Sequence, residues 1–180
     1  MPSSRNTEVM KMSEKTATVT QYLTFKLEDE VYATDITQVR EVLEYSKVTK
    51  VPRTPDYMRG VINLRGRVVP VLDLKLRFGM TRTEQTVNTC VIIVEVNMDS
   101  DNMIIGALAD SVQEVIEMDP SVIEPPPKIG TRLNTDFIRG MGKRDEQFVI
   151  MLDIDKVFSS ENLDEVESTI AEEETVTAHD

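Results

Sequence analysis

The chain contains one stretch of sequence twice, and this internal repeat constrains its fold more than any other feature. Residues 56–78, DYMRGVINLRGRVVPVLDLKLRF, align without a gap with residues 136–158, DFIRGMGKRDEQFVIMLDIDKVF. Of the 23 aligned positions, seven are identical and six more exchange similar apolar residues, whereas ordinary amino-acid usage would give roughly one or two identities. The repeat predicts two related units of roughly 80 residues each.

The two copies share a frame but differ in one loop. Arg59, Gly60 and Asp73 recur 80 positions later in the chain. Matched glycines indicate a backbone position that needs a bulge or a positive φ. By contrast, the six consecutive positions 62–67 share no residue with their counterparts. The loop NLRG at 63–66 is therefore free to serve something other than folding.

Short strands separated by tight turns fill both units. Leu23, Phe25 and Leu27 alternate with polar residues, which predicts a half-buried strand. Segments 60–64 and 67–72 predict a hairpin closed by Arg65-Gly66. Segments 90–94 and 103–109 are apolar at both odd and even positions, so both faces of these strands need cover. Five short strands in each unit predict a mainly β fold with a small closed barrel in each.

Short helices are expected where an aspartate can act as the N-cap. Asp35 is expected to cap a helix from Ile36 to Val42. Asp73 and Asp153 occupy the same place in the two copies of the repeat, each before a short helix. Beyond Ser160, the apolar residues at 163, 166 and 170 have helical spacing, which predicts a C-terminal helix that packs on a barrel.

These patterns divide the chain into segments. They are a disordered N-terminal arm over residues 1–20, a first β-barrel unit over 21–81, a second β-barrel unit over 82–159, a C-terminal helix over 160–171 and an acidic disordered tail over 172–180. The arm and the tail lack the apolar residues that a packed core requires. Units this small bury little surface alone, so we expect the two units to share an interface.

The charge of the chain argues against nucleic acid as a partner. The net charge is −12, but eight acidic residues and no Lys or Arg lie between Glu161 and Asp180, so the rest of the chain carries −12 plus 8, or −4. Phosphate binding needs an excess of Lys and Arg. With no secretory signal and no apolar run long enough to cross a membrane, the protein is expected to be cytoplasmic.

The sequence favours a binding module over an enzyme. The only histidine is His179, next to the last residue, so no catalytic or metal-binding constellation that uses histidine is expected, and no metal or cofactor. One alternative is a carboxylate-dependent enzyme that uses Asp73 with Glu41 or Asp153. Because Asp73 and Asp153 both precede a short helix, N-capping is the favoured role. A second alternative is an oligonucleotide-binding barrel.

Arg65 and Glu41 are candidate binding residues. Arg65 occupies the tip of the predicted hairpin, and its guanidinium is suited to hold a partner's carboxylate or backbone carbonyls. Glu41 is expected either as a solvated acid on a helix face or as a partner of Arg65. Their opposite charges fit one shared polar rim.

Longer runs carry a resemblance to a known family. They are VYATDITQVREV, VTKVPRTPDYMRGVINLRGRVVPVLDL, IIGALADSVQEV and IEPPP leading to LNTDFIRG. These runs resemble the CheW family of bacterial chemotaxis coupling proteins, and the resemblance spans residues 21–163. It implies two intertwined five-stranded SH3-like β-barrels with short helices and no catalytic activity.

The resemblance also implies partners and contact residues. The expected function is a scaffold that links the cytoplasmic tip of methyl-accepting chemoreceptors to the regulatory domain of the histidine kinase CheA, at membrane receptor arrays. Kinase contact is expected mainly on the second barrel. For receptor contact, the implied residues are Val39, Glu41, Gly60 and Arg65. For the kinase and ring contact they are Glu124, where the family can have a basic residue, and Ile129, where it often has a bulkier apolar one.

Overall fold

The computed structural model describes residues 19–98, 101–126 and 137–158, which form two five-stranded β-sheets. The strands are β1 (Thr20–Leu27), β2 (Glu30–Asp35), β3 (Val39–Glu44), β4 (Met58–Leu64), β5 (Arg67–Asp73), β6 (Cys90–Met98), β7 (Asp101–Ala109), β8 (Ser111–Met118), β9 (Ile138–Arg144) and β10 (Gln147–Leu152). Two short α-helices, α2 (Leu74–Arg77) and α3 (Ile154–Val157), follow β5 and β10. The prediction of a mainly β fold is confirmed. The expected N-terminal arm up to residue 18, the C-terminal helix and the acidic tail lie outside the described residues.

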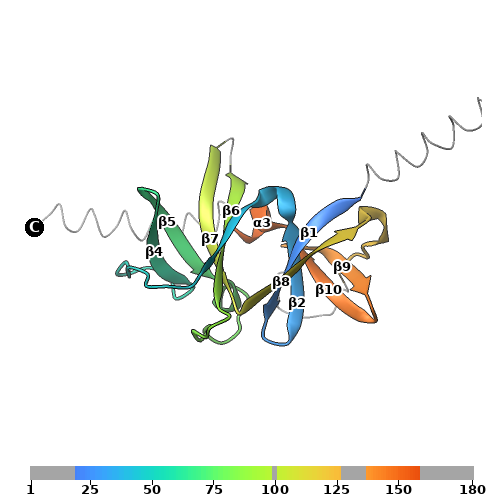
Figure 1. The fold of residues 1–180 in the computed structure, drawn as a ribbon, viewed down its shortest axis with the longest axis horizontal. Helices are drawn as coiled ribbons and strands as arrows, with labels where there is room; N and C mark the ends of the chain where they lie inside the picture. The colour runs from blue at the N-terminus through green and yellow to red at the C-terminus, as the bar shows by residue number, and fades with distance from the viewer. Residues whose placement is uncertain (1–18, 99–100, 127–136, 159–180) are drawn as a thin grey trace, which may run out of the picture.

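Each sheet takes strands from both sequence units. Sheet A has the order β8-β1-β2-β10-β9, and sheet B has the order β3-β6-β7-β5-β4. The two lie side by side along the long axis of the molecule, with the β4–β5 hairpin at one end and the β9–β10 hairpin at the other (Figure 1). The intertwined arrangement is therefore confirmed. The expectation that the strands of one unit form that unit's own barrel is wrong, because a boundary at residue 81 divides the repeat but not the sheets.

The core explains why the strands interleave. One cluster of buried side chains draws on both sheets, with Phe25 and Leu152 from sheet A and Leu72 and Ile92 from sheet B. The opposite faces of the two sheets bury separate clusters, one around Met151 and one around Ile93. As predicted, β6 is covered on both faces. Neither sheet can bury the face that it contributes to the shared cluster without the other.

The segment after β2 differs from its prediction. Asp35 does act as an N-cap, since its Oδ1 accepts a hydrogen bond from the backbone N–H of Thr37 at 2.9 Å. The cap begins only a 3₁₀ turn, Ile36–Gln38, and the chain then enters β3 instead of continuing as a helix to Val42. In β3 the side chains alternate between partly buried and exposed, and pairing with β6 satisfies the backbone, so sheet formation overrides the local cap.

The two copies of the repeat share the same backbone hydrogen bond and the same helix cap. The backbone N–H of Asp73 donates to the carbonyl of Tyr57 at 2.6 Å, and that of Asp153 donates to the carbonyl of Phe137 at 2.8 Å. Both aspartates cap the helix that follows, α2 and α3 respectively, as the sequence predicted. The matched residues thus hold each hairpin against the start of its helix.

The β9–β10 turn is strained, and we expect Glu146→Gly to stabilise the protein by about 0.5–1 kcal/mol. Asp145 and Glu146 have φ values of 49° and 67°, in the left-handed region where glycine is favoured. The β4–β5 turn has Gly66 at the matching place, with φ of 84°. Urea unfolding of the Glu146→Gly chain tests this, with Gly66→Ala as the reverse control that should lose stability. Equal or lower stability for Glu146→Gly would show that the Glu146 side chain contributes a compensating contact.

Candidate functional site

Arg65 lies at the tip of the β4–β5 hairpin. The φ values of 52° at Arg65 and 84° at Gly66 are those of a tight turn that matches the strand twist. Asn63 Oδ1 accepts a hydrogen bond from the backbone N–H of Gly66 at 2.8 Å and holds this turn. The predicted hairpin is confirmed, and it presents the Arg65 side chain to solvent with 73% of its surface exposed.

The guanidinium of Arg65 pairs with the carboxylate of Glu41 on β3. Nη1 donates to Oε2 at 2.7 Å and Nη2 donates to Oε1 at 3.1 Å, which is a bidentate geometry. These hydrogen bonds lower the pKa of Glu41 from its usual 4.5 and raise the pKa of Arg65. The pair is therefore ionised at neutral pH, and its contribution is lost only as the pH falls through the lowered pKa of Glu41. Of the two roles expected for Glu41, the structure supports the partner of Arg65, and the helix-face role is wrong because Glu41 lies in a strand.

This Glu41–Arg65 clasp joins the two edges of sheet B. Glu41 lies on β3, one edge strand, and Arg65 lies on the turn that follows β4, the other edge strand. The β3–β6 register shifts between Val39 and Glu41, and such a β-bulge can re-aim a side chain. The clasp is therefore built from a bulge on one edge and a hairpin tip on the other.

Sheet A contains a matching clasp. Glu114 on β8 accepts a hydrogen bond from Nη1 of Arg144 on β9 at 2.6 Å, and β8 and β9 are the two edge strands of sheet A. The β1–β8 register also shifts beside this glutamate. Glu41 and Glu114 occupy the same place in the repeated Val-X-Glu-Val motif at 39–42 and 112–115. The repetition of this motif is a sequence signal that could have led to the second clasp.

A groove opens beside the first clasp. It is lined by Arg40, Glu41, Leu64, Arg65, Arg67, Ile93, Glu95, Asn102 and Ile104. A second ion pair lies in its lining, where Arg40 on β3 donates to the carboxylate of Glu95 on the neighbouring strand β6. The groove therefore combines partly buried apolar side chains, Leu64 and Ile104, with two ion-paired arginines, Arg40 and Arg65. The sequence did not indicate Arg40, Arg67 or Glu95, because their proximity depends on strand pairing.

The other two candidate receptor contacts lie apart from the groove lining. Val39 is partly buried and packs against the core between the sheets. Gly60 is buried with φ of 145°, and a Cβ atom there would lie 2.3 Å from the carbonyl oxygen of Thr49. The structure brings Glu41 and Arg65 together, and it gives Val39 and Gly60 roles in packing and in the backbone.

Glu124, the candidate kinase and ring contact, lies on the outer side of β9. Its backbone pairs with Met141 through two hydrogen bonds of 2.9 Å and 2.7 Å, and its side chain is exposed. Gly140 lies beneath it, where a Cβ atom would approach the carbonyl oxygen of Glu124 to 2.4 Å. Ile129 lies outside the described residues.

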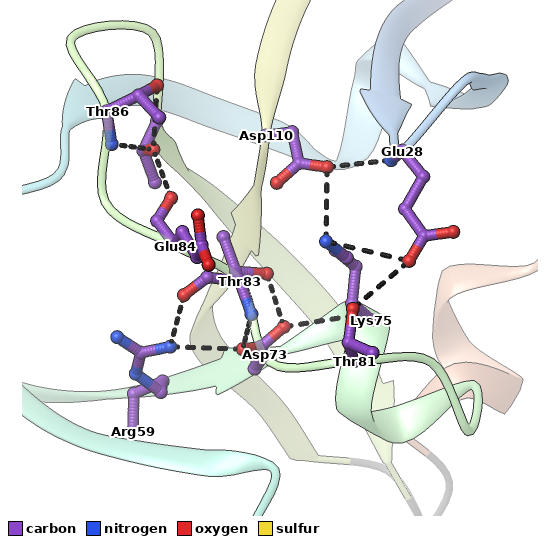
Figure 2. Close-up of polar contacts among 10 residues, drawn as sticks. Glu28, Arg59, Asp73, Lys75, Thr81, Thr83, Glu84, Thr86 and Asp110 are labelled. Atoms are coloured by element: carbon purple, nitrogen blue, oxygen red, sulfur yellow. Dashed lines mark hydrogen bonds and ion pairs between the residues drawn. The ribbon is translucent and has the colours of Figure 1, made fainter.

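Asp73 is the centre of a buried polar network, shown in Figure 2. Its Oδ1 accepts from the backbone N–H of Lys75 at 3.1 Å and from Thr83 Oγ1 at 2.7 Å. Its Oδ2 accepts from the backbone N–H of Thr83 at 3.0 Å and from Nη1 of Arg59 at 3.2 Å. The side chain of Asp73 has no exposed surface. A carboxylate with both oxygens engaged and no access to solvent is unsuited to act on a substrate, and the geometry assigns Asp73 a structural role.

Lys75 extends this network to sheet A. Its Nζ lies 3.8 Å from Glu28 Oε1 and 3.6 Å from Asp110 Oδ2, and its side chain is 9% exposed. Asp110 also accepts a hydrogen bond from the backbone N–H of Glu28 at 2.7 Å (Figure 2). Because Glu28 belongs to the β1–β2 turn and Lys75 to α2, the network ties the two sheets together.

Across the described parts of the chain, none of the helices is long and apolar enough to cross a membrane.

Comparisons with known proteins decide the family. The CheW-like domain model matches residues 21–162. The chain belongs to the CheW family. Two of its relatives are the chemotaxis protein CheW of Klebsiella aerogenes, 34% identical over 79% of this chain and 84% of the relative, and that of Bacillus subtilis, 31% identical over 84% of this chain and 94% of the relative.

A solved structure agrees with this assignment. The crystal structure of the scaffolding protein TtCheW from Thermoanaerobacter tengcongensis superposes with a TM-score of 0.68 at 37% identity, over 77% of this chain and 87% of that one. The resemblance to the CheW family found in the sequence is confirmed, as is the fold that it implies. Family membership places the protein in chemotaxis signalling as a scaffold or adaptor.

Proposed function

We propose that this CheW-family protein is a non-enzymatic scaffold that couples the cytoplasmic tips of methyl-accepting chemoreceptors to the regulatory domain of the histidine kinase CheA. It acts in the cytoplasm, is recruited to membrane receptor arrays, and needs no cofactor. The proposal that the protein binds receptors rests on one observation, the Glu41–Arg65 clasp, whose arginine is exposed beside a groove that contains apolar side chains. Glu124, exposed beside β9, remains the proposed contact for the kinase and ring, together with Ile129.

The clasp leaves Arg65 able to bind a partner. A guanidinium has five N–H donors, and Glu41 accepts two hydrogen bonds from Arg65, so three donors remain for carbonyl or carboxylate oxygens of a receptor. Glu41 holds the side chain in one orientation, which reduces the entropy that binding must overcome. Glu41 is thus proposed as the residue that positions Arg65, and Arg65 as the residue that contacts the receptor.

Arg65→Glu is expected to weaken binding of a receptor-tip fragment by about thirtyfold, because loss of a central arginine contact typically has an effect of this size. The thermal unfolding temperature should hardly change, since the side chain is exposed at a hairpin tip. Affinity for the isolated kinase regulatory domain should stay within about twofold. Calorimetric titration of the variant against each partner separately measures these effects.

Arg144→Glu is the matched control, because it breaks the equivalent clasp on sheet A. It should leave receptor affinity unchanged. If Arg65→Glu and Arg144→Glu weaken receptor binding equally, or if Arg65→Glu weakens both partners equally, the assignment of the receptor to the sheet B groove is wrong.

A further inference from the structure

The groove beside the Glu41–Arg65 clasp has the character of a docking site for an acidic amphipathic helix. Its apolar surface comes from Leu64 and Ile104, which are partly buried and pack on the fully buried Ile93 in the apolar cluster of sheet B. Its lining contains three arginines and two glutamates, a net charge of +1. Both glutamates are already paired with arginines, so an entering ligand meets arginine N–H donors above an apolar surface. Such grooves bind helices through one apolar face.

The chain itself carries a segment of this chemistry. Residues 161–171, ENLDEVESTIA, contain four acidic residues and no Lys or Arg. Leu163, Val166 and Ile170 are spaced by three and four positions, which places them on one face of a helix. Asp164 and Glu167 each follow a residue of this apolar stripe. The segment therefore matches the groove in both its apolar and its charged components.

Near its end, the described chain contacts strands that border the groove. Oδ1 of Asp155 on α3 accepts hydrogen bonds from the backbone N–H of Asn97 and from Nε2 of Gln38, both at 2.9 Å. Asn97 is on β6, which also supplies Ile93 and Glu95 to the groove, and Gln38 immediately precedes β3. The five residues from Phe158 to Leu163 can span roughly 16 Å when extended. Phe158 itself is buried in the core between the sheets, and the short connection to Leu163 gives the segment a raised effective concentration near β3 and β6.

We propose that residues 161–171 dock in this groove as a helix, with the apolar stripe on the apolar side chains of the groove and the flanking carboxylates beside Arg40, Arg65 and Arg67. The docked segment occupies the groove in place of a partner. The segment would then compete with a chemoreceptor for the groove, and this part of the proposal rests on the function proposed above. If it occupies the groove in nine of ten molecules, the apparent affinity for the receptor is lowered about tenfold.

Paramagnetic relaxation in the full-length chain tests the docking. The label is a nitroxide on Ser168→Cys in a Cys90→Ser background, a position that would face away from the stripe in the proposed helix. We expect the amide signals of Leu64, Ile93, Asn102 and Ile104 to lose at least about half of their intensity relative to the reduced label, an effect that requires proximity. Arg67→Glu should restore these signals, and Lys143→Glu, an exposed residue on β9, should not. Full intensity at the groove, or restoration by Lys143→Glu alone, overturns the proposal.

A second measurement needs no label and keeps Cys90. Replacing Asp164, Glu165 and Glu167 by Asn, Gln and Gln should shift the amide signals of Asn102 and Ile104. Replacing Glu172, Glu173 and Glu174 by Gln removes the same charge from beyond the segment and should leave these signals in place. Unchanged signals in the first variant, or equal shifts in both, contradict docking in the groove.

Titration with a receptor-tip fragment separates this proposal from the proposed function. The Asp164, Glu165 and Glu167 variant should bind the fragment about tenfold more tightly than the natural chain. If neither chain binds the fragment, the receptor assignment fails while the relaxation result still decides the docking. If both chains bind with equal affinity, the segment does not compete for the groove, and the competition is wrong.

Discussion

Replacing Asp73 with alanine is expected to lower the free energy of unfolding by about 3–5 kcal/mol, because it leaves a buried arginine without its counter-charge. The side chain of Arg59 is only 9% exposed, and that of Asp73 is fully buried. The substitution also removes the acceptor for the backbone N–H groups of Lys75 and Thr83 and for the Thr83 hydroxyl. Urea unfolding followed by circular dichroism measures the loss.

Asp153→Ala is the matched control for this prediction, since Asp153 is the same residue in the second copy of the repeat. Its side chain caps α3 through the backbone N–H of Lys156 at 3.3 Å, and the counterpart of Arg59, Arg139, is exposed. Loss of a cap alone has an effect of about 1 kcal/mol. Similar losses for the two variants would mean that the Arg59–Asp73 pair contributes little beyond capping.

Gly60→Ala is expected to destabilise the protein by about 2–5 kcal/mol, from a strained φ together with overpacking. The φ of Gly60 is 145°, and a Cβ atom would lie 2.3 Å from the carbonyl oxygen of Thr49. Thr49 cannot easily retreat, because its backbone exchanges hydrogen bonds of 2.9 Å and 2.8 Å with Val61. Thermal and urea unfolding of the variant test the expectation.

Gly79→Ala is the control for the part of this loss of stability that comes from a positive φ alone. Gly79 also has a positive φ, of 80°, but a Cβ atom there meets nothing within 4 Å, so the expected loss is only about 1 kcal/mol. The Gly60→Ala variant also tests the proposed receptor site, because the family resemblance implies that Gly60 contacts the receptor. Weak receptor binding by a Gly60→Ala chain of normal stability would place Gly60 in the interface itself, against the backbone role that the structure assigns to it.

The features that could be predicted from the sequence are those that depend on neighbouring residues. The Arg65-Gly66 turn follows from the preference of glycine for positive φ, and the caps at Asp73 and Asp153 follow from hydrogen bonds to backbone groups two or three residues ahead. The internal repeat indicated a shared backbone frame, and its divergent loop indicated the position of Arg65, the proposed receptor contact. The Glu41–Arg65 pair was one of two roles open to Glu41.

The tertiary structure alone decided which strands share a sheet and which charges meet. Thr24 bonds to Glu114 across 90 positions, and Gln38 bonds to Asp155 across 117. Such contacts depend on burying both faces of β6 and β7 at once, which only strands from both units can do. The same pairing turned the segment after Asp35 from a predicted helix into a strand and brought Arg40 against Glu95. The local sequence pattern determined the turns and the helix caps. The order of the strands depended on the free energy of the whole core, because residues that are distant in the sequence contribute to that core jointly.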